Sequence, residues 1–436
     1  MIPYSYLKVL KLGGRLSKIL IGIFIIYHVI KIFQNNTKKV VLIWWTPFMP
    51  ASNRIIKCYG GEYECIVTSD RSFTNHIDLG AFLIYGSHIE NNDFPLPRTA
   101  SWAIFHEESP KNYAPFLFEI QHLFNITSTF SRYSDFPITL QYLANLMSIT
   151  DNKYYIPVEI KNTYLKTQAP VLYIQSDCDT PLGRDYLVKK LAKYVEIDSY
   201  GKCLKNKEFP KEYVIYMINC TKYFCNFFFR LKTVFPLDLY NNEYLEFISK
   251  YKFIIAFENA ICDDYVTEKF WRPIIVGSIP IYLGAPNIED WLPNEQSAIL
   301  VKNFKNMKAV ANFINILNKN DTLYESFLGH KLSGRITNSL LEENVLSQHP
   351  ITGFECYVCK RVHENNFEVE HPKRNVYKCP KPIPQSDEEN TWNQHWDIGK
   401  CQSKALELLL QKGKPYSNDE FEQLWKTFLQ ERTCYE

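Results

Sequence analysis

Two neighbouring carboxylates, Glu107 and Glu108, stand directly after a short apolar run in the first third of the chain. The run has the composition of a buried strand, so both acids are expected at a strand end. A carboxylate there can act as a general base and take the proton of an attacking hydroxyl. His106 could hydrogen-bond to either acid. The residues alone leave Glu107 and Glu108 as alternatives for this role.

A second group of polar residues follows another apolar run in the second half of the chain. Asp263 or Asp264 can cap the next helix and Gly277 can end it, which predicts a βαβ unit. Glu268 and Lys269 fall in the first turn, where free N–H groups can hold a phosphate. The carboxylate can accept from sugar hydroxyls and the ammonium can pair with a diphosphate. Without further context, the same pair is most often solvated surface.

The elements that must position these residues form two α/β series. The chain has 436 residues, of which 46% are hydrophobic. This length is too great for a single hydrophobic core. Its 49 lysines and arginines nearly cancel its 47 acidic residues, so charge gives no argument for a nucleic-acid partner. Apolar runs predict strands at 40–45, 65–68, 81–85, 101–105, 171–175, 195–199, 253–257 and 279–283. We expect domains over 36–165 and 166–348, followed by a cysteine-bearing extension over 349–436.

The N-terminus reads as a membrane anchor. Basic residues precede an apolar run that extends from residue 19 to 33 if Lys31 snorkels. This span is shorter than the roughly 20 residues that usually cross a bilayer, and a signal peptide is the alternative. We expect a cytosolic tail over 1–18, a signal-anchor helix over 19–33 and a luminal remainder. The apolar stretch 213–235 is interpreted as an unusual insert. If it crossed the membrane a second time, Arg184 and the motifs after residue 235 would lie on opposite sides of the membrane.

Sequons and cysteines agree with a luminal placement. N-glycosylation sequons begin at Asn35, Asn125, Asn219 and Asn320. The chain has twelve cysteines, which suits disulfides in an oxidising compartment. A zinc site is the alternative, because Cys356-x-x-Cys359 is followed by His363 and His371. The second Cys-x-x-Cys of a zinc ribbon is missing, so disulfides are favoured.

Three motifs stand in order in the second half of the chain: Phe257-Glu258-Asn259, Tyr265-Val266-Thr267-Glu268-Lys269 and Pro280-Ile281-Tyr282-Leu283-Gly284. In these residues the chain resembles the α1,3-fucosyltransferase family, glycosyltransferase family ten. The similarity runs from about residue 40 to 359, and the stretches 176–179 and 199–203 resemble the branch of fucosyltransferases ten and eleven. The resemblance implies the GT-B fold, with two Rossmann-like domains facing a cleft, and GDP-fucose as donor.

The resemblance also implies roles for single residues. The GDP-fucose-binding positions become Arg184, Asn259, Tyr265, Glu268 and Lys269. The Arg184 guanidinium would clamp the diphosphate in place of a metal. The Glu-Ser-Pro motif of the family matches Glu108 as the base, with Glu107 as competitor. Disulfides are implied between Cys58 and Cys356 and between Cys65 and Cys359.

No obligatory cofactor or metal is expected. The sequence Asp177-Cys178-Asp179 imitates an Asp-x-Asp metal motif, but such a short pattern is common and a diphosphate clamp is already available. We therefore interpret the two aspartates as structural, with a Mn²⁺ site as the minority alternative.

Three functions are compatible with these residues. The main expectation is an inverting, single-pass type II Golgi α1,3-fucosyltransferase that moves L-fucose from GDP-β-L-fucose to an N-acetylglucosamine-type glycan. The endoplasmic reticulum is the alternative compartment. A protein O-fucosyltransferase acting on Ser or Thr of folded luminal modules is the second reading. An inactive binding protein with a transferase fold is the third, and the intact donor motifs count against it. Nothing in the sequence identifies the acceptor.

Overall fold

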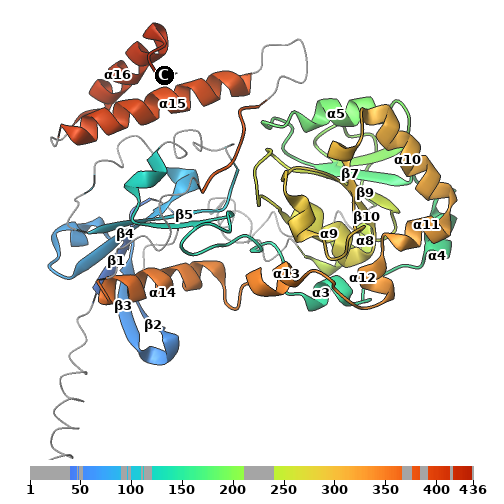
Figure 1. Cartoon of the computed structure of the whole chain (residues 1–436), viewed down its shortest axis with the longest axis horizontal. Coiled ribbons are helices and arrows are strands. Elements are labelled where there is room, and N and C mark those ends of the chain that lie inside the picture. Colours follow the sequence, from blue (N-terminus) through green and yellow to red (C-terminus); the bar gives the residue numbers. More distant parts are fainter. Residues whose placement is uncertain are drawn as a thin grey trace, which may run out of the picture.

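The structure is a computed structural model that describes residues 40–46, 48, 53–89, 96, 100–109, 111, 120–210, 240–365, 376–382, 391–412 and 416–434. Within these residues the chain forms two α/β units, each built on one sheet, and a helical C-terminal extension (Figure 1). The predicted tail, anchor and insert lie outside the described residues, as do Asn35, Asn219 and His371. Among the described helices, none combines the length and the apolar character needed to span a bilayer.

The first sheet has six strands in the order β2-β3-β1-β4-β5-β6. They are β1 Val40–Trp44, β2 Arg54–Cys58, β3 Tyr63–Thr68, β4 Leu79–Tyr85, β5 Ser101–His106 and β6 Ile126–Thr129. Only β2 pairs antiparallel, and it does so at the edge with β3. Every residue of β1 and β5 is buried. Strands covered on both faces read as continuous apolar runs, which is why the sequence predicted these two.

The second sheet is wholly parallel and has the order β11-β10-β9-β7-β8. Its strands are β7 Val171–Gln175, β8 Ile197–Gly201, β9 Phe253–Phe257, β10 Ile279–Leu283 and β11 Ile299–Leu300. The winding reverses between β7 and β9, which is the topological switch point of this sheet. Ligands of such sheets bind beyond the carboxyl ends of the strands at that point.

Helices surround the second sheet in Figure 1. They are α5 Arg184–Leu191, α8 Asn242–Ile248, α9 Glu268–Val276, α10 Met307–Lys319, α11 Asp321–Ser326, α12 Gly329–Leu332 and α13 Ser339–Asn344. Short 3₁₀ turns lie at Tyr59–Gly61, Arg71–Asn75, Gly86–His88, Gln121–Leu123, Ile288–Trp291 and Val301–Asn303.

Helix α9 starts and stops for different reasons. Its N-cap is Thr267, whose side chain accepts from the backbone N–H of Lys269, and it ends at Gly277 in the left-handed region, with φ 65°. The prediction that Asp263 or Asp264 caps this helix is wrong, because a cap must directly precede the first helical residue. Asp264 instead accepts two hydrogen bonds from Arg132 of the first unit, at 3.0 and 2.9 Å. The predicted end at Gly277 is confirmed.

The segment that joins the two sheets packs on the second one. Helices α3 Met147–Thr150 and α4 Val158–Tyr164 contact α9, α12 and α11. Leu140 and Leu143 belong to the same core cluster as Trp271. The sequence placed this segment in the first domain because the predicted strands of the second domain begin only at residue 171. Long-range packing assigns α3 and α4 to the second unit.

The C-terminal extension returns to the first unit. Helix α14 Pro350–His363 packs against β1, β2 and β3, while α15 Thr391–Gln411 and α16 Asn418–Glu431 pack against each other (Figure 1). The structure contains both disulfides that the resemblance implied, Cys58–Cys356 and Cys65–Cys359. Further disulfides join Cys178 to Cys203, Cys262 to Cys379 and Cys401 to Cys434.

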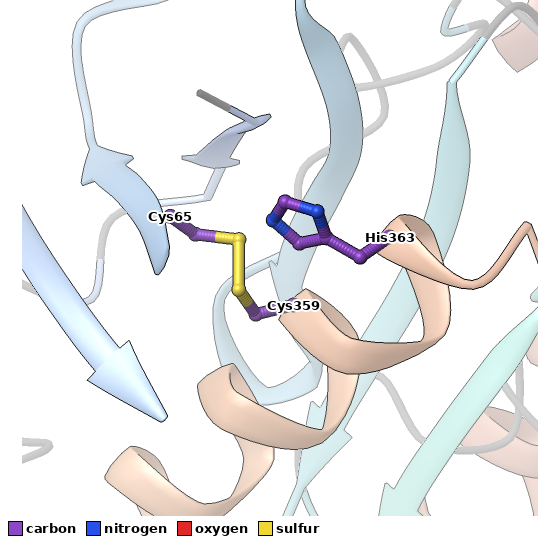
Figure 2. A group of neighbouring side chains, drawn as sticks. All are labelled: Cys65, Cys359 and His363. Carbon is purple, nitrogen blue, oxygen red and sulfur yellow. A yellow bond between two sulfur atoms is a disulfide. The ribbon is translucent and has the colours of Figure 1, made fainter. Parts of the chain in front are cut away.

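A disulfide stands where the sequence left a zinc site near Cys359 as the alternative. Cys65, Cys359 and His363 do lie together, and Figure 2 shows the two sulfur atoms bonded to each other beside the imidazole. His363 Nε2 lies 3.0 Å from the carbonyl oxygen of Glu64. Zinc takes cysteine as a thiolate, so sulfurs that are joined in a disulfide cannot serve as its ligands.

Each predicted strand is present with bounds within two residues of the expectation. The strands that the sequence missed are β2, β6 and β11. They are short or lie at a sheet edge, and β2 reads Arg-Ile-Ile-Lys-Cys without a continuous apolar run.

The two disulfides of α14 close nearly the same loop, with sequence separations of 298 and 294 residues. We predict that their contributions to stability are not additive. With one bridge intact, loss of the other releases only a small ring and costs roughly 3 kcal/mol, whereas loss of both costs roughly 8 kcal/mol in the chain-entropy model. Urea unfolding of Cys58→Ala/Cys356→Ala, of Cys65→Ala/Cys359→Ala and of the quadruple variant measures this. The prediction is contradicted if the quadruple variant loses no more free energy of unfolding than the two pairwise losses added together.

Candidate functional site

Arg184 and Asn259 meet across the switch point of the second sheet. Arg184 opens α5 after β7, and Asn259 follows the end of β9. The guanidinium donates to Asn259 Oδ1 at 2.7 Å and to the carbonyl oxygens of Phe257 at 3.4 Å and Asp177 at 2.5 Å. Arg184 is buried and only 1% exposed to solvent.

No carboxylate pairs with Arg184 within the part of the chain that the structure describes. All three acceptors are uncharged oxygens, and Nε has no partner among these residues. A buried cation without a counter-ion is costly, so it marks a place where an anion binds. The geometry therefore predicts an anion site at the carboxyl ends of β7 and β9.

Glu108 reaches this point from the first unit. Its Oε1 accepts from Tyr265 Oη at 2.5 Å and from Asn259 Nδ2 at 3.2 Å, both of the second unit. The same oxygen accepts from the N–H and hydroxyl of Ser109, at 2.7 and 2.8 Å. These four donors all converge on Oε1. Oε2 is thus the oxygen left to take a proton.

Lys269 lies at the start of α9 among carboxylates. Its Nζ is 3.2 Å from Glu268 Oε1 and 3.8 Å from Glu258 Oε2. Burial would lower the pKa of Lys269, but the charges of Glu268, Glu258 and Glu108 outweigh it and raise that pKa. Burial would raise the pKa of Glu268, yet Lys269 and Arg272 hold it at about 2. Lys269 and Glu268 are therefore both charged at neutral pH.

Glu107 and Glu108 have opposite pKa shifts. Burial would raise the pKa of Glu108, but Lys269 and the hydrogen bonds of Tyr265 and Ser109 outweigh it, so the pKa lies below its ordinary value. Burial raises the pKa of Glu107 to about 7, and the hydroxyl of Tyr85 that binds it only partly offsets this. The other oxygen of Glu107 is buried without a partner among the described residues. Of the two acids, only Glu108 forms a hydrogen bond to the second unit among the described residues.

His106 does not bind either acid. Its Nδ1 lies 2.7 Å from the hydroxyl of Tyr377 in the C-terminal extension. Burial lowers the pKa of His106 to about 4, so the ring is neutral at physiological pH. The expectation that His106 hydrogen-bonds to Glu107 or Glu108 is wrong, because the last side chain of β5 is turned to a segment remote in sequence.

Two further residues of the site were not predicted as part of it. Lys111 forms an ion pair with Asp177 and thereby joins the loop after β5 to the loop after β7. Glu258 accepts from the N–H and hydroxyl of Thr267, at 2.8 and 2.7 Å, and its burial raises its pKa to about 7. Glu258 stands inside the Phe-Glu-Asn motif, so the motif was the available signal. For Lys111, which depends on a contact between units, the sequence offers none.

The Asp-x-Asp pattern is divided between different partners. Asp177 pairs with Lys111, and Asp179 Oδ1 accepts from Trp392 Nε1 at 2.7 Å. Cys178 between them is bonded to Cys203.

Of the two described sequon asparagines, Asn320 is exposed and caps α11, while Asn125 is half-buried and accepts from the Trp102 N–H at 3.0 Å.

Comparison with known proteins identifies the family. A model of the N-terminal domain of fucosyltransferases matches residues 36–142, and a model described as glycosyltransferase family 10 (fucosyltransferase) C-term matches 164–378. Proteins named GDP-fucose protein O-fucosyltransferase 3 from Xenopus laevis and Homo sapiens are each 37% identical. The alignments cover 89% and 87% of this chain and 84% and 81% of those proteins.

Among solved structures, one of an α1,3-fucosyltransferase aligns with 16% identity and a TM-score of 0.44, covering 78% of this chain and 93% of that one. This likeness is too low to add to the assignment.

These comparisons correct one expectation. The main reading of an α1,3-fucosyltransferase that acts on a glycan is wrong, because the curated relatives carry the name of protein O-fucosyltransferases. The residues that gave the α1,3 reading are those expected to bind the donor, and they say nothing of the acceptor. The finer resemblance to the branch of fucosyltransferases ten and eleven stays a prediction. On the family models and on the identity to these relatives, the chain belongs to glycosyltransferase family 10, the fucosyltransferases.

Proposed function

We propose that this chain is a protein O-fucosyltransferase that moves L-fucose from GDP-fucose to a Ser or Thr hydroxyl of folded protein modules, with inversion at the sugar. The names of relatives at 37% identity support the donor and the class of acceptor. The observation that carries the proposal is the buried cation Arg184, which pairs with no carboxylate among the described residues and is joined through Asn259 to a carboxylate of the other unit. Two α/β units that meet at this site correspond to the GT-B arrangement.

The second unit binds the donor in this proposal. Arg184 and Lys269 hold the diphosphate, which supplies the negative charge that the buried guanidinium lacks. Glu268, ionised at neutral pH because its pKa is about 2, accepts from sugar hydroxyls. Both cations stabilise the charge that develops on GDP as it leaves. We propose on this basis that no metal is obligatory, and transfer that persists in EDTA is the test of that point.

The first unit supplies the base. The acceptor oxygen attacks C1 of fucose, the bond from C1 to the phosphate oxygen breaks, and GDP leaves with the bonding electrons. Glu108 Oε2 takes the hydroxyl proton, while Oε1 is held by Tyr265, Asn259 and Ser109. Attack from the face opposite GDP converts the β-linked donor into an α-glycoside through an oxocarbenium-like state. Glu107 remains the competitor for the proton.

We place the protein in the secretory pathway, with its folded part in the lumen. Ten cysteines of the described residues are joined in five disulfides, which form and persist in oxidising compartments. The Golgi membrane with a single-pass anchor over 19–33 remains the preferred location, and the endoplasmic reticulum, where modules fold, is the alternative.

The acceptor class is tested with the full chain and radiolabelled GDP-fucose. We expect label on Ser or Thr of folded, disulfide-bonded modules of secreted proteins, released by alkaline β-elimination. The same modules after reduction and alkylation are the matched control and should take up little label. A glycan ending in N-acetylglucosamine is the competing acceptor. Label on the glycan alone contradicts the proposal, and label on nothing while GDP binds supports the inactive alternative.

The identity of the base is tested by two matched variants. Glu108→Gln should reduce kcat by a factor on the order of 10² to 10⁴, since it removes the general base but keeps the shape of the side chain. Glu107→Gln should retain most of the activity, because Glu107 contacts Tyr85 of its own unit. GDP affinity, measured by calorimetry, should survive in both. The reverse order of effects assigns the proton to Glu107, and loss of GDP binding in Glu108→Gln removes Glu108 from the role of base.

The pH dependence of kcat/KM separates the same two acids without mutation. A base must be deprotonated, so activity falls as the pH drops through its pKa. With Glu108, whose pKa is lowered, kcat/KM stays level from pH 7 into the acidic range and falls only below the ordinary carboxyl range. With Glu107, it falls already below about pH 7. Glu107→Gln is the control and should leave the profile unchanged, with circular dichroism confirming that the protein stays folded.

A further inference from the structure

The C-terminal extension contacts both sides of the proposed site. Helix α14 packs on the first unit. Further along the chain, residues 376–382 pass between the two units and are followed by α15 (Figure 1). We name the segment 376–382 the strap. The model of the family's C-terminal domain ends at residue 378. The strap therefore continues beyond the part of the chain that the family model covers.

On the first unit, the strap contacts the strand that carries the base. The hydroxyl of Tyr377 lies 2.7 Å from Nδ1 of His106, the last residue of β5 and two residues before Glu108. Tyr377 is 3% exposed, so this bond is shielded from water. It fixes the end of β5, from which Glu108 projects. Its ring also packs edge-on against Phe130, with centroids 5.7 Å apart.

On the second unit, the strap is bonded to the loop that carries the partners of the base. Cys379 forms a disulfide with Cys262, and the N–H of Asp263 donates to the carbonyl oxygen of Lys378 at 3.1 Å. The loop lies between Asn259 and Tyr265, the two residues that donate to Glu108. A third contact joins α15 to the loop after β7, where Trp392 donates to Asp179 at 2.7 Å.

We propose that the strap positions the base: Tyr377 and the Cys262–Cys379 disulfide hold the end of β5 and the 259–265 loop at a fixed separation, so that Glu108 meets Tyr265 and Asn259 before any substrate binds. This inference rests on the proposed function of Glu108. Glu108 and its two donors stand on different units, and hydrogen bonds across such a boundary are kept only if the units do not drift apart. The disulfide beside the 259–265 loop and the buried hydrogen bond at the end of β5 contribute to that constraint, in addition to the bonds between Arg132 and Asp264. Tyr377 acts through His106 and is a positioning residue, not a catalytic one.

The test uses two pairs of matched variants in the full chain. Tyr377→Phe removes only the hydroxyl that binds His106, and Tyr416→Phe removes a hydroxyl of the same extension that has no partner among the described residues. Cys262→Ser/Cys379→Ser cuts the tie to the second unit, while Cys401→Ser/Cys434→Ser cuts the disulfide that joins α15 to the end of the chain beyond α16. In each pair the chemical change is identical, and only the strap variant removes a contact to the site.

Steady-state kinetics give the first readout. Tyr377→Phe should lower kcat about two- to tenfold, the equivalent of one hydrogen bond, with the KM for GDP-fucose unchanged, because the donor half of the site is untouched. The cysteine pair of the strap should lower kcat at least as much. Both control variants should keep the kcat of the wild type. A loss of thermal stability without this split between kcat and KM would mean that the strap is only structural.

Amide hydrogen exchange gives a second readout that needs no activity. Peptides covering 103–109 and 259–266 should exchange faster in both strap variants, with the amide of Asp263 most affected, and not in the two controls. Unchanged exchange in the strap variants overturns the inference whatever the kinetics show. Should the wild type transfer fucose to no acceptor, the proposed function fails, and the exchange data alone decide whether the strap holds the two loops. Should the cysteine variant not fold, Tyr377→Phe still decides.

Discussion

The constraint on which the site depends is the burial of a guanidinium that has no counter-ion among the residues that the structure describes. Arg184 is fixed by three uncharged oxygens, at the point where the second sheet reverses its winding. Uncharged acceptors orient a cation but do not neutralise it, so its field acts on whatever anion enters. The fold places the first residue of α5 there because Gly183 adopts the left-handed conformation, with φ 62°, directly before the helix. The loop after β7 and the start of α5 are thus shaped around this one side chain.

The second cation is treated in the opposite way. Lys269 has carboxylates on several sides, and these stabilise its charge when no ligand is bound. Glu258 among them has a pKa near 7, raised by burial, so its charge is partly lost at neutral pH. In the proposed function, an incoming diphosphate would compete with these acids for Lys269, whereas at Arg184 it would meet only uncharged acceptors among the described residues. The two cations of the proposed clamp therefore differ in what they give up when the donor binds.

Much of the second unit follows from its sequence, and the reasons are local. The βαβ unit around α9 is marked by two apolar runs, a helix-ending Gly277 and a cap, and these signals act within a few residues of each other. The wrong cap shows the limit of such reasoning, since Asp263, Asp264 and Thr267 all belong to the residue types that cap helices and only the length of the turn decides among them. Arg184 and Asn259 were assigned to one site by the resemblance to the family, and the parallel sheet explains why they meet, because it brings the carboxyl ends of its strands to one edge.

What the sequence could not give depends on contacts between remote segments. The partner of His106 stands 271 positions further along the chain, and Lys111 meets Asp177 only because two units fold against each other. The pairing of Cys262 with Cys379 is of the same kind, as twelve cysteines allow many connectivities and only two bridges were implied by the resemblance. The packing of α3 and α4 on the second unit also had no local signal.

The acceptor was misjudged for a chemical reason. A general base takes a proton from a sugar hydroxyl and from a Ser or Thr hydroxyl in the same way, so the proposed base Glu108 and its neighbours carry no record of the acceptor. The donor motifs are shared because every such enzyme must hold the same diphosphate and fucose. Acceptor choice is then left to surfaces around the base, which have no motif of their own.

The two adjacent acids show how position alone assigns a role. Glu107 and Glu108 have the same chemistry and differ by one residue in the chain. Alternation at the strand end turns one toward Tyr85 in its own unit and the other toward Tyr265 in the second. Burial raises the pKa of Glu107 to about 7, whereas Lys269 and four converging donors keep Glu108 ionised. Pairs of carboxylates whose environments drive their pKa values apart are the usual basis for dividing acid and base roles. Here only the ionised member faces the cations that would hold the leaving group.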